Sequence, residues 1–327
     1  MLRSARTAQV TDTHAVTIRA AGFALASAAL IAATAACGTE IKEPRDVAVD
    51  TSGSSTVAAA GTTGSSGSLA TPAVVVPKVS LSDGELAYKD KRYAEATQLF
   101  STYADQNPNN PWGHYMLGLS AWKSGNLDLA ETAFGHSLEL DPKHVKTLHN
   151  LARVNLEQGR VKDARDRVSE ALKLDSSSGE GYRLMGRVRA AMNQPNEAIA
   201  AYRVALSKDP VDVWSMNNMG LLLIQQGRNE EALGPLARAV QLDSAVAVFQ
   251  NNLGIALEHT GRFVLATQAY KSAVAADEGY TKAKLSLARV EGRVEDPSVT
   301  PIELATLAQT FDREIRGVQM GGPVPQN

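Results

Sequence analysis

The sequence predicts an all-α fold, a solenoid built from one repeated pair of helices. Six alanines recur every 34 residues: Ala96, Ala130, Ala164, Ala198, Ala232 and Ala266. Small residues keep the same interval in a second series: Gly84, Gly118, Ala152, Gly186, Gly220, Gly254 and Ala288. Larger residues form a third series: Phe100, Phe134, Val168, Tyr202, Leu236 and Tyr270. Three series that stay in step without an insertion are typical of an array of identical units.

Each unit contains two stretches of helical periodicity separated by a turn. In the fifth unit apolar residues follow helical spacing from Val213 to Gln226, Gly227 interrupts the pattern, and Glu230 to Leu242 resumes it. A glycine marks this break in four units and predicts a left-handed turn residue: Gly125, Gly159, Gly227 and Gly261. Asp-Pro or Asp-Ser pairs close four units and favour the end of a helix pair: Asp141-Pro142, Asp175-Ser176, Asp209-Pro210 and Asp243-Ser244.

These positions resemble the tetratricopeptide repeat. In the fourth unit the family's signature positions hold Tyr182, Met185, Gly186, Ala198, Tyr202, Ala205 and Pro210. Three other units lack the terminal proline and carry Ser176, Ser244 and Glu278 instead. The resemblance implies a right-handed α-solenoid in which the first helix of each repeat lines a concave groove. We expect the small residues where the paired helices cross and the large third series between neighbouring pairs.

The array is expected to fill residues 78–293. Six repeats are predicted at 77–110, 111–144, 145–178, 179–212, 213–246 and 247–280. A capping helix should follow from Tyr280 to about Arg293, because such arrays need a polar end.

A separate amphipathic helix is expected within residues 294–317. Thr300-Pro301-Ile302-Glu303 combines an N-cap, a first-turn proline and a reciprocal glutamate. Four apolar residues then follow at helical spacing, Leu304, Leu307, Phe311 and Ile315. We expect this stripe to pack on the capping helix; alternatively, it occupies the groove or docks on a partner. Residues 318–327 are expected to be disordered.

The first 37 residues resemble a secretory signal. Three arginines precede an uncharged, apolar stretch from Ala20 to Ala36, and small residues stand directly before the single cysteine, Cys37. This end is similar to the bacterial lipobox, although Thr34 stands where leucine is usual. The resemblance implies lipidation of Cys37 and anchorage at the bacterial envelope, on the outer membrane in a Gram-negative cell. The alternatives are an uncleaved anchor, or cleavage that leaves a soluble exported protein.

Residues 38–77 are predicted to be a disordered linker. They consist mainly of Ser, Thr, Gly, Ala and Pro and cannot bury enough apolar surface to offset the entropy of ordering. A flexible chain of this length spans roughly 35 Å, which suits a tether.

Composition and motifs argue against catalysis. Lys plus Arg number 33 and Asp plus Glu number 35, a balance that gives no long-range attraction to nucleic acid. The chain has no P-loop, no Gly-x-Ser-x-Gly turn and no His-Glu-x-x-His motif. His144 and His149 are five residues apart, whereas two ligands on one helix face are three or four apart. We therefore expect no enzyme, cofactor, metal or nucleic-acid partner.

The resemblance places the binding residues at fixed positions of the first helices. Ten are predicted to line the groove: Trp112, Tyr115, Lys146, His149, Arg153, Arg183, Arg187, Trp214, Asn217 and Asn251. A basic patch lies between aromatic residues, and Trp and Arg are frequent binding hot spots. The partner would be an extended or helical protein segment with aromatic anchors and some acidic character. Alternatively, the basic residues pair with neighbouring glutamates and the aromatics belong partly to the core.

We predict a non-enzymatic interaction scaffold tethered to the bacterial envelope, which binds envelope proteins or peptides. Its architecture is similar to that of repeat lipoproteins in pilus biogenesis, and roles in secretion or envelope assembly are equally compatible with it. The alternative is an envelope protein that captures glycans or other substrates by stacking sugars on Trp and Tyr. An enzyme is the remote alternative.

Overall fold

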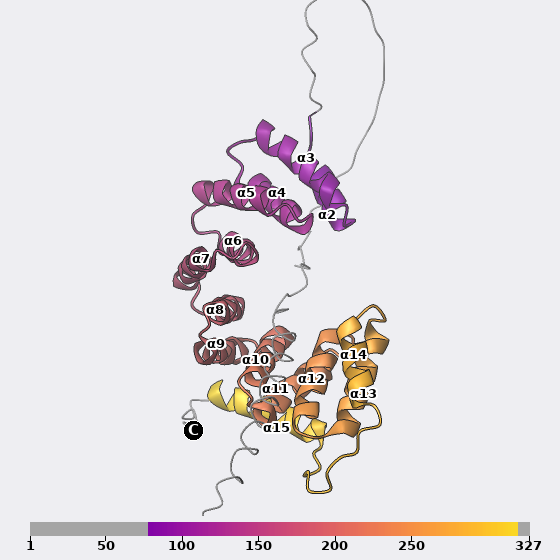
Figure 1. Ribbon diagram of the computed structural model, residues 1–327. Coiled ribbons are helices and arrows are strands. Elements are labelled where there is room, and N and C mark those ends of the chain that lie inside the picture. Colours follow the sequence, from indigo (N-terminus) through magenta and orange to yellow (C-terminus); the bar gives the residue numbers. More distant parts are fainter. Residues whose placement is uncertain (1–77, 320–327) are drawn as a thin grey trace, which may run out of the picture. The chain divides into compact units, whose positions relative to one another are not determined.

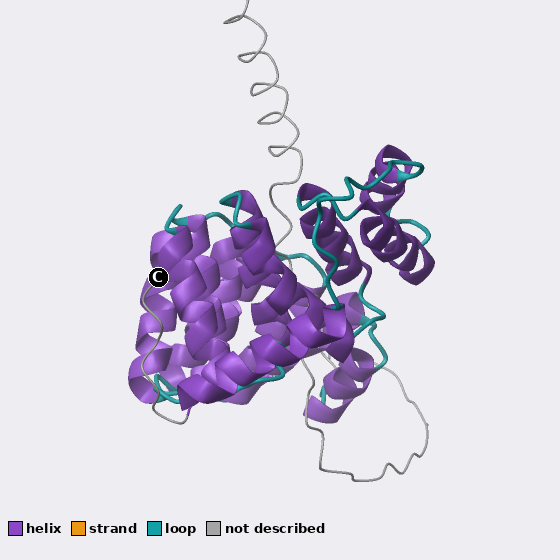
Figure 2. Ribbon diagram, turned by 90° about the horizontal axis from the view of Figure 1, so that it is seen from below, coloured by secondary structure: helices purple, strands orange, loops and turns teal. Residues whose placement is uncertain are grey.

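The computed structural model describes residues 78–319, and this part of the chain consists of fourteen helices without a strand (Figure 1; Figure 2). The first helices of the six repeats are α2 (Leu81–Lys89), α4 (Pro111–Lys123), α6 (Val145–Glu157), α8 (Gly179–Ala191), α10 (Val213–Gln225) and α12 (Ala247–His259). The second helices are α3 (Tyr93–Gln106), α5 (Leu127–Leu140), α7 (Val161–Leu174), α9 (Pro195–Lys208), α11 (Asn229–Leu242) and α13 (Phe263–Ala276). The capping helix α14 (Thr281–Val290) and a last helix, α15 (Leu304–Gln319), complete the series. The predicted all-α repeat solenoid is confirmed.

The turn between paired helices has a left-handed residue at the same place in every repeat. The four expected glycines have φ between +74° and +88°, which confirms their predicted conformation. The two remaining repeats use residues with a side chain, Lys91 at φ +60° and Asn193 at φ +58°. Asparagine tolerates this region better than most residues, whereas lysine gains nothing from it.

Repeats two to six each end at an aspartate whose side chain caps the next turn. The carboxylate accepts the backbone N–H two residues further on, at 2.8–3.2 Å, after the second helix of repeats two to six. This local hydrogen bond competes with continuation of the helix. The aspartate therefore defines the repeat boundary even where serine or glutamate replaces the following proline.

The small and large series meet inside each repeat. A Cβ built on Gly84, Gly118, Gly186, Gly220 or Gly254 would lie 2.5–2.6 Å from the large residue of the same repeat. The large residues were expected between neighbouring pairs, and the structure shows that in these five repeats each packs on the glycine of its own pair. Repeat three is the exception, with Ala152 and Val168 wholly buried in one small cluster.

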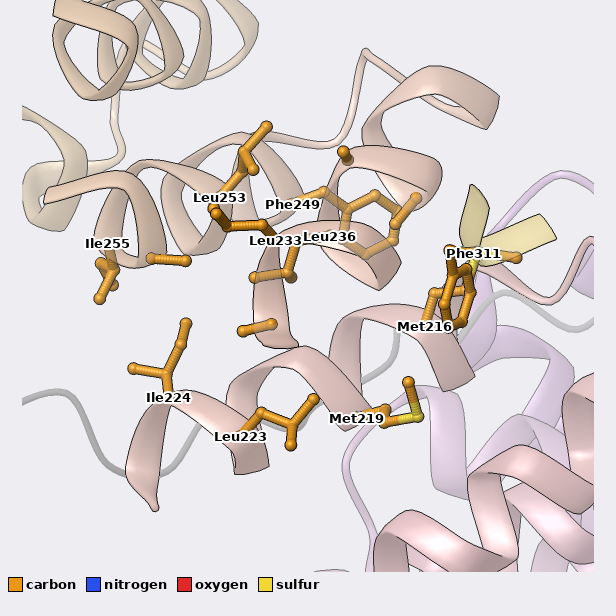
Figure 3. Close-up of a cluster of buried hydrophobic side chains, with 14 of the residues drawn as sticks. Met216, Met219, Leu223, Ile224, Leu233, Leu236, Phe249, Leu253, Ile255 and Phe311 are labelled. Carbon is orange, nitrogen blue, oxygen red and sulfur yellow. The ribbon is translucent and has the colours of Figure 1, made fainter. Parts of the chain in front are cut away.

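First helices of neighbouring repeats pack on one another, as in α4 with α6 and α10 with α12, and second helices pack mainly on first helices. The first helices therefore form a common surface, here called the first-helix face. The largest apolar core joins repeats four to six, and Figure 3 shows Met216, Leu236 and Phe249 within it. A second core joins repeats one and two with α6.

The last helix packs in an unexpected place. α15 lies against α11 and α9, the second helices of repeats five and four, and it buries Ala308, Phe311 and Ile315 (Figure 1). The predictions that it packs on the capping helix or occupies the groove are therefore wrong. Its place follows from the chain path: the segment before it crosses the α12–α13 turn, where Arg262 donates to the Thr300 carbonyl at 3.4 Å.

The expected boundaries of the C-terminal part differ slightly from the structure. α15 ends at Gln319, beyond the predicted limit at residue 317, so residues 318 and 319 are helical. The predicted signal peptide with Cys37 at residues 1–37, the linker at 38–77 and the rest of the tail lie outside the described residues. Within residues 78–319, every helix is too short or too polar to span a membrane.

Candidate functional site

Trp112 is the most accessible aromatic residue of the predicted groove. It stands at the start of α4, is 36% exposed, and donates from its ring nitrogen to Glu85 of α2 at 3.2 Å. Its ring lies 5.1 Å from that of Tyr115, which packs edge-on against His144. Tyr115 itself is 4% exposed, and burial raises its pKa to about 12. Trp112 therefore packs on a buried tyrosine that is itself held by a neighbouring ring.

Trp214 occupies the same place in repeat five as Trp112 in repeat two. It begins α10, is half-buried, and meets Phe249 of α12 edge-to-face with ring centroids 4.9 Å apart. Lys146, at the corresponding place in repeat three, is exposed. Two tryptophans and one lysine therefore share a single row of the first-helix face.

The basic patch is largely neutralised by acidic residues. Arg153 of α6 is 5% exposed. Its guanidinium group donates one hydrogen bond to Asn150 and another, at 2.5 Å, to Glu180 of α8. His149, which is 3% exposed, lies 3.6 Å from the other Glu180 oxygen. Partial burial tends to raise the pKa of Glu180, but the neighbouring His149 and Arg153 outweigh it and hold that pKa well below its usual value. The group links repeats three and four.

A second ion pair joins repeats four and five. Arg183 of α8 donates to Asp212 at 3.0 Å, and Asp212 is buried at the N-cap of α10, where it also accepts from Ser215. Arg187 is half-buried one turn further along α8. Arg183 therefore positions a helix start, and little of its charge remains for a partner.

Buried asparagines connect repeats five and six. Asn252 donates to Asn217 at 2.9 Å, Asn217 donates to Asn218 at 3.3 Å, and Asn251 donates to Asn252 at 3.4 Å. All four are at most 5% exposed. One bond of this chain, from Asn252 to Asn217, crosses from α12 to α10 and joins the two helices, and the other two bonds hold its partners in place.

The structure therefore divides the ten predicted groove residues. Trp112, Lys146, Trp214 and Arg187 remain at least partly accessible. Five others are almost wholly buried: Tyr115, His149, Arg153, Asn217 and Asn251. The tenth, Arg183, has a 17% exposed side chain and pairs with Asp212. The alternative that the basic residues pair with acidic ones is thereby supported. Asp212 was missed, although its place directly before a predicted helix marks an N-cap aspartate.

Nothing in residues 78–319 suggests a reactive centre. No group of three or more His, Cys, Asp or Glu side chains in this part of the chain is arranged to hold a metal. A hollow of about 640 Å³ lies away from the first-helix face, between α9 and the start of α11. Its lining is Asn196, Ile199, Ala200, Arg203, Arg228 and Glu231.

Comparison with known families shows to which family the chain belongs. The profile of the tetratricopeptide repeat family matches residues 115–179, 183–247 and 217–281, which together make up about half of the sequence. The chain belongs to the tetratricopeptide repeat family. Proteins with these repeats serve as protein-interaction scaffolds, and the match indicates no catalytic family.

Individual relatives are distant and longer than this chain. Cellulose synthase 1 operon protein C of Komagataeibacter xylinus is 28% identical over 138 residues, which are 42% of this chain and 10% of the relative. The peroxisomal targeting signal receptor of Kluyveromyces lactis is 30% identical over 100 residues, 31% of this chain and 18% of the receptor. The solved APC/C hetero-tetramer Cut9–Hcn1 has a TM-score of 0.58 at 16% identity, covering 64% of this chain and 42% of that one. The solved structure shares the fold.

Proposed function

We propose that this tetratricopeptide repeat protein is a non-catalytic scaffold whose first-helix face binds a segment of a protein partner. The observation that carries the proposal is the pair Trp112 and Trp214, which stand in the same row three repeats apart. Both rings are held in place, Trp112 by Glu85 and Trp214 by Phe249, and remain partly accessible. A rigid, accessible indole loses little entropy on binding and is a frequent hot spot.

The partner is a protein segment with two apolar or aromatic anchors. Arg153 and Arg183 are already paired with Glu180 and Asp212. Lys146 is therefore the main residue that could attract an acidic group of the partner. Lys146 and Glu180 lie in turn between the tryptophans in the row. Glu180 is already paired with Arg153, so Lys146 is the charge that would meet an acidic residue between the two anchors.

The glycan alternative receives less support. A sugar-binding face needs accessible rings on which to stack, but Tyr88, Tyr115 and Trp122 are 3–7% exposed. Trp112 alone offers a substantial ring surface at that end. Glycan capture is therefore not part of the proposal, and evidence for it in the binding test would contradict the proposal.

Anchorage at the bacterial envelope through a lipid on Cys37 is also part of the proposal. It is supported by the sequence before Cys37, and a role in pilus, secretion or envelope assembly would follow from such a location. Labelling of cells with a clickable fatty acid tests it. The full chain should incorporate the label and Cys37→Ala should not; equal labelling of the two, or none, would remove lipidation from the proposal.

The binding proposal is tested by crosslinking in intact cells of the source organism, followed by identification of the captured proteins. The full chain is compared with Trp112→Ala/Trp214→Ala, and the matched control is Leu174→Ala/Val264→Ala, two exposed apolar residues of second helices. The proposal expects specific proteins to disappear from the tryptophan variant only. Identical capture by all three proteins, or dependence on soluble glycan instead of protein, contradicts it.

A further inference from the structure

We propose that α15 is a brace that fixes the angle between repeats four and five, and with it the shape of the first-helix face. The proposal does not depend on what that face binds. It begins with the position of α15, which contacts α11 of repeat five and α9 of repeat four. A helix that lies across two neighbouring repeats resists their rotation against each other.

The two first helices make little contact with each other at the junction that α15 crosses. Among neighbouring first helices, α8 and α10 make the sparsest contact. An ion pair between Arg183 and Asp212 joins them on the first-helix side. On the other side the hollow of about 640 Å³ separates α9 from the start of α11.

α15 adds apolar contact to this junction from the side of the second helices. Ala308, Phe311 and Ile315 lie on one face of the helix and are 1–4% exposed, and Phe311 belongs to the same buried cluster as Met216 (Figure 3). Gly234 of α11 allows the close approach, because a Cβ there would already contact the Phe311 Cβ at 3.4 Å. Such interdigitated contact fixes the relative position of helices.

Polar contacts hold both the brace and the segment that leads to it. Arg238 of α11 pairs with Asp312 at 3.0 Å, and both side chains are largely shielded. In the connecting segment the Glu295 carboxylate accepts the Val264 N–H at 2.7 Å, and the Thr300 carbonyl accepts from Arg262. Repeat six is thereby tied to the same brace, so that repeats four to six form one block.

The junction between repeats three and four provides an internal comparison, because α15 does not reach it. It is held by Arg153, His149 and Glu180, and by a core of five buried apolar residues, three from repeat three and two from α8 of repeat four. If α15 acts as a brace, the two junctions should respond differently when α15 is displaced.

The experiment measures distances between pairs of spin labels on the full chain with Cys37→Ser. Cysteines at the exposed positions Glu197 and Gln268 report across the braced junction, and cysteines at Thr132 and Glu197 report across the unbraced one. α15 is displaced by Gly234→Arg and, independently, by Phe311→Asp. The control is Gly135→Arg, since a side chain on Gly135 of α5 would meet nothing within 4 Å. Hydrogen exchange of the α15 amides shows whether the helix has left its place.

We expect the two displacing variants to raise α15 exchange about tenfold or more and to broaden or shift the 197–268 distance distribution. The 132–197 distribution should stay as in the parent, and Gly135→Arg should change neither distribution. An unchanged 197–268 distribution with α15 displaced would overturn the proposal. It would equally be overturned if α15 stayed protected in both variants, because the contacts named here would then not hold it.

Discussion

The ring of Tyr202 fills the space that a side chain on Gly186 would need. A Cβ on Gly186 would lie 2.5 Å from the Tyr202 Cε1, closer than real contacts allow. Four other repeats pair a first-helix glycine with a large residue in the same way. Repeat three instead combines the larger Ala152 with the smaller Val168. The sizes at the two positions therefore compensate each other, and this complementarity sets how closely the paired helices approach.

Gly186→Ala should destabilise the protein by about 1–3 kcal/mol, because overpacking outweighs the better helix propensity of alanine. Urea unfolding measures the effect. Gly135→Ala, with nothing within 4 Å, is the control and should be neutral or stabilise by up to about 1 kcal/mol. The double variant Gly186→Ala/Tyr202→Val reproduces the pair of repeat three. The double variant should lose less unfolding free energy than the sum of the losses in the two single variants. Strictly additive losses would show that the sizes of the two residues do not compensate each other.

Lys91→Gly should stabilise the protein by about 1 kcal/mol. Lys91 has φ +60° at the turn where four other repeats carry glycine, and a side chain in this region is strained. The reverse change at the equivalent turn, Gly159→Ala, should destabilise by a similar amount, because Gly159 has φ +75° but no steric neighbour within 4 Å. Thermal unfolding of the two variants should move in opposite directions. A shift in the same direction would rule out the strain explanation.

Asn252→Ala should destabilise by about 1–3 kcal/mol, because it leaves buried groups of Asn217 and Asn251 without a hydrogen-bond partner. Removing Asn217 as well should add less than its single effect, since the shared bond is then already lost. A double-mutant cycle followed by urea unfolding measures this coupling. A coupling energy near zero would show that the amide chain does not join the two repeats.

The Glu180 group predicts an acid-sensitive contribution to stability. Because the pKa of Glu180 is lowered by His149 and Arg153 in the folded protein, the charged form stabilises the fold above the unfolded pKa near 4.5. This contribution is lost as the pH falls from there toward the folded pKa. Glu180→Gln should destabilise by about 1 kcal/mol at neutral pH, and the difference from the parent should shrink below about pH 4. Unfolding curves at several pH values test this; a difference that does not vary with pH would contradict the assignment.

The fold could be predicted in detail because the same residue types recur at the same positions of successive repeats. Gly125, Gly159, Gly227 and Gly261 were read correctly as left-handed turn residues. Lys91 escaped prediction because its conformation is imposed by the neighbouring helices and not by its own preference. The surface on which α15 packs could not be predicted from the sequence either. Its apolar stripe predicts a helix that needs a surface, but the choice between α14 and α11 depends on the path of the connecting segment.

The candidate site was predicted only in outline. Register alone placed Trp112 and Trp214 in one row, and the structure leaves both partly accessible. Register could not show that Arg153 and Arg183 would find Glu180 and Asp212, because each pair joins different helices 27–29 residues apart. A charge is available to a partner only where the neighbouring helix brings no counter-ion, and this depends on packing.

The central claim is that the partner binds the first-helix face. Its most direct test is a photo-crosslinking amino acid at Lys146, which lies between the two tryptophans of the row, compared with one at Lys173 on α7; both positions are exposed. The account predicts defined protein adducts from position 146, their loss in Trp112→Ala/Trp214→Ala, and none of the same adducts from position 173. Adducts that arise at position 173 alone, or that persist from position 146 without the tryptophans, would contradict it.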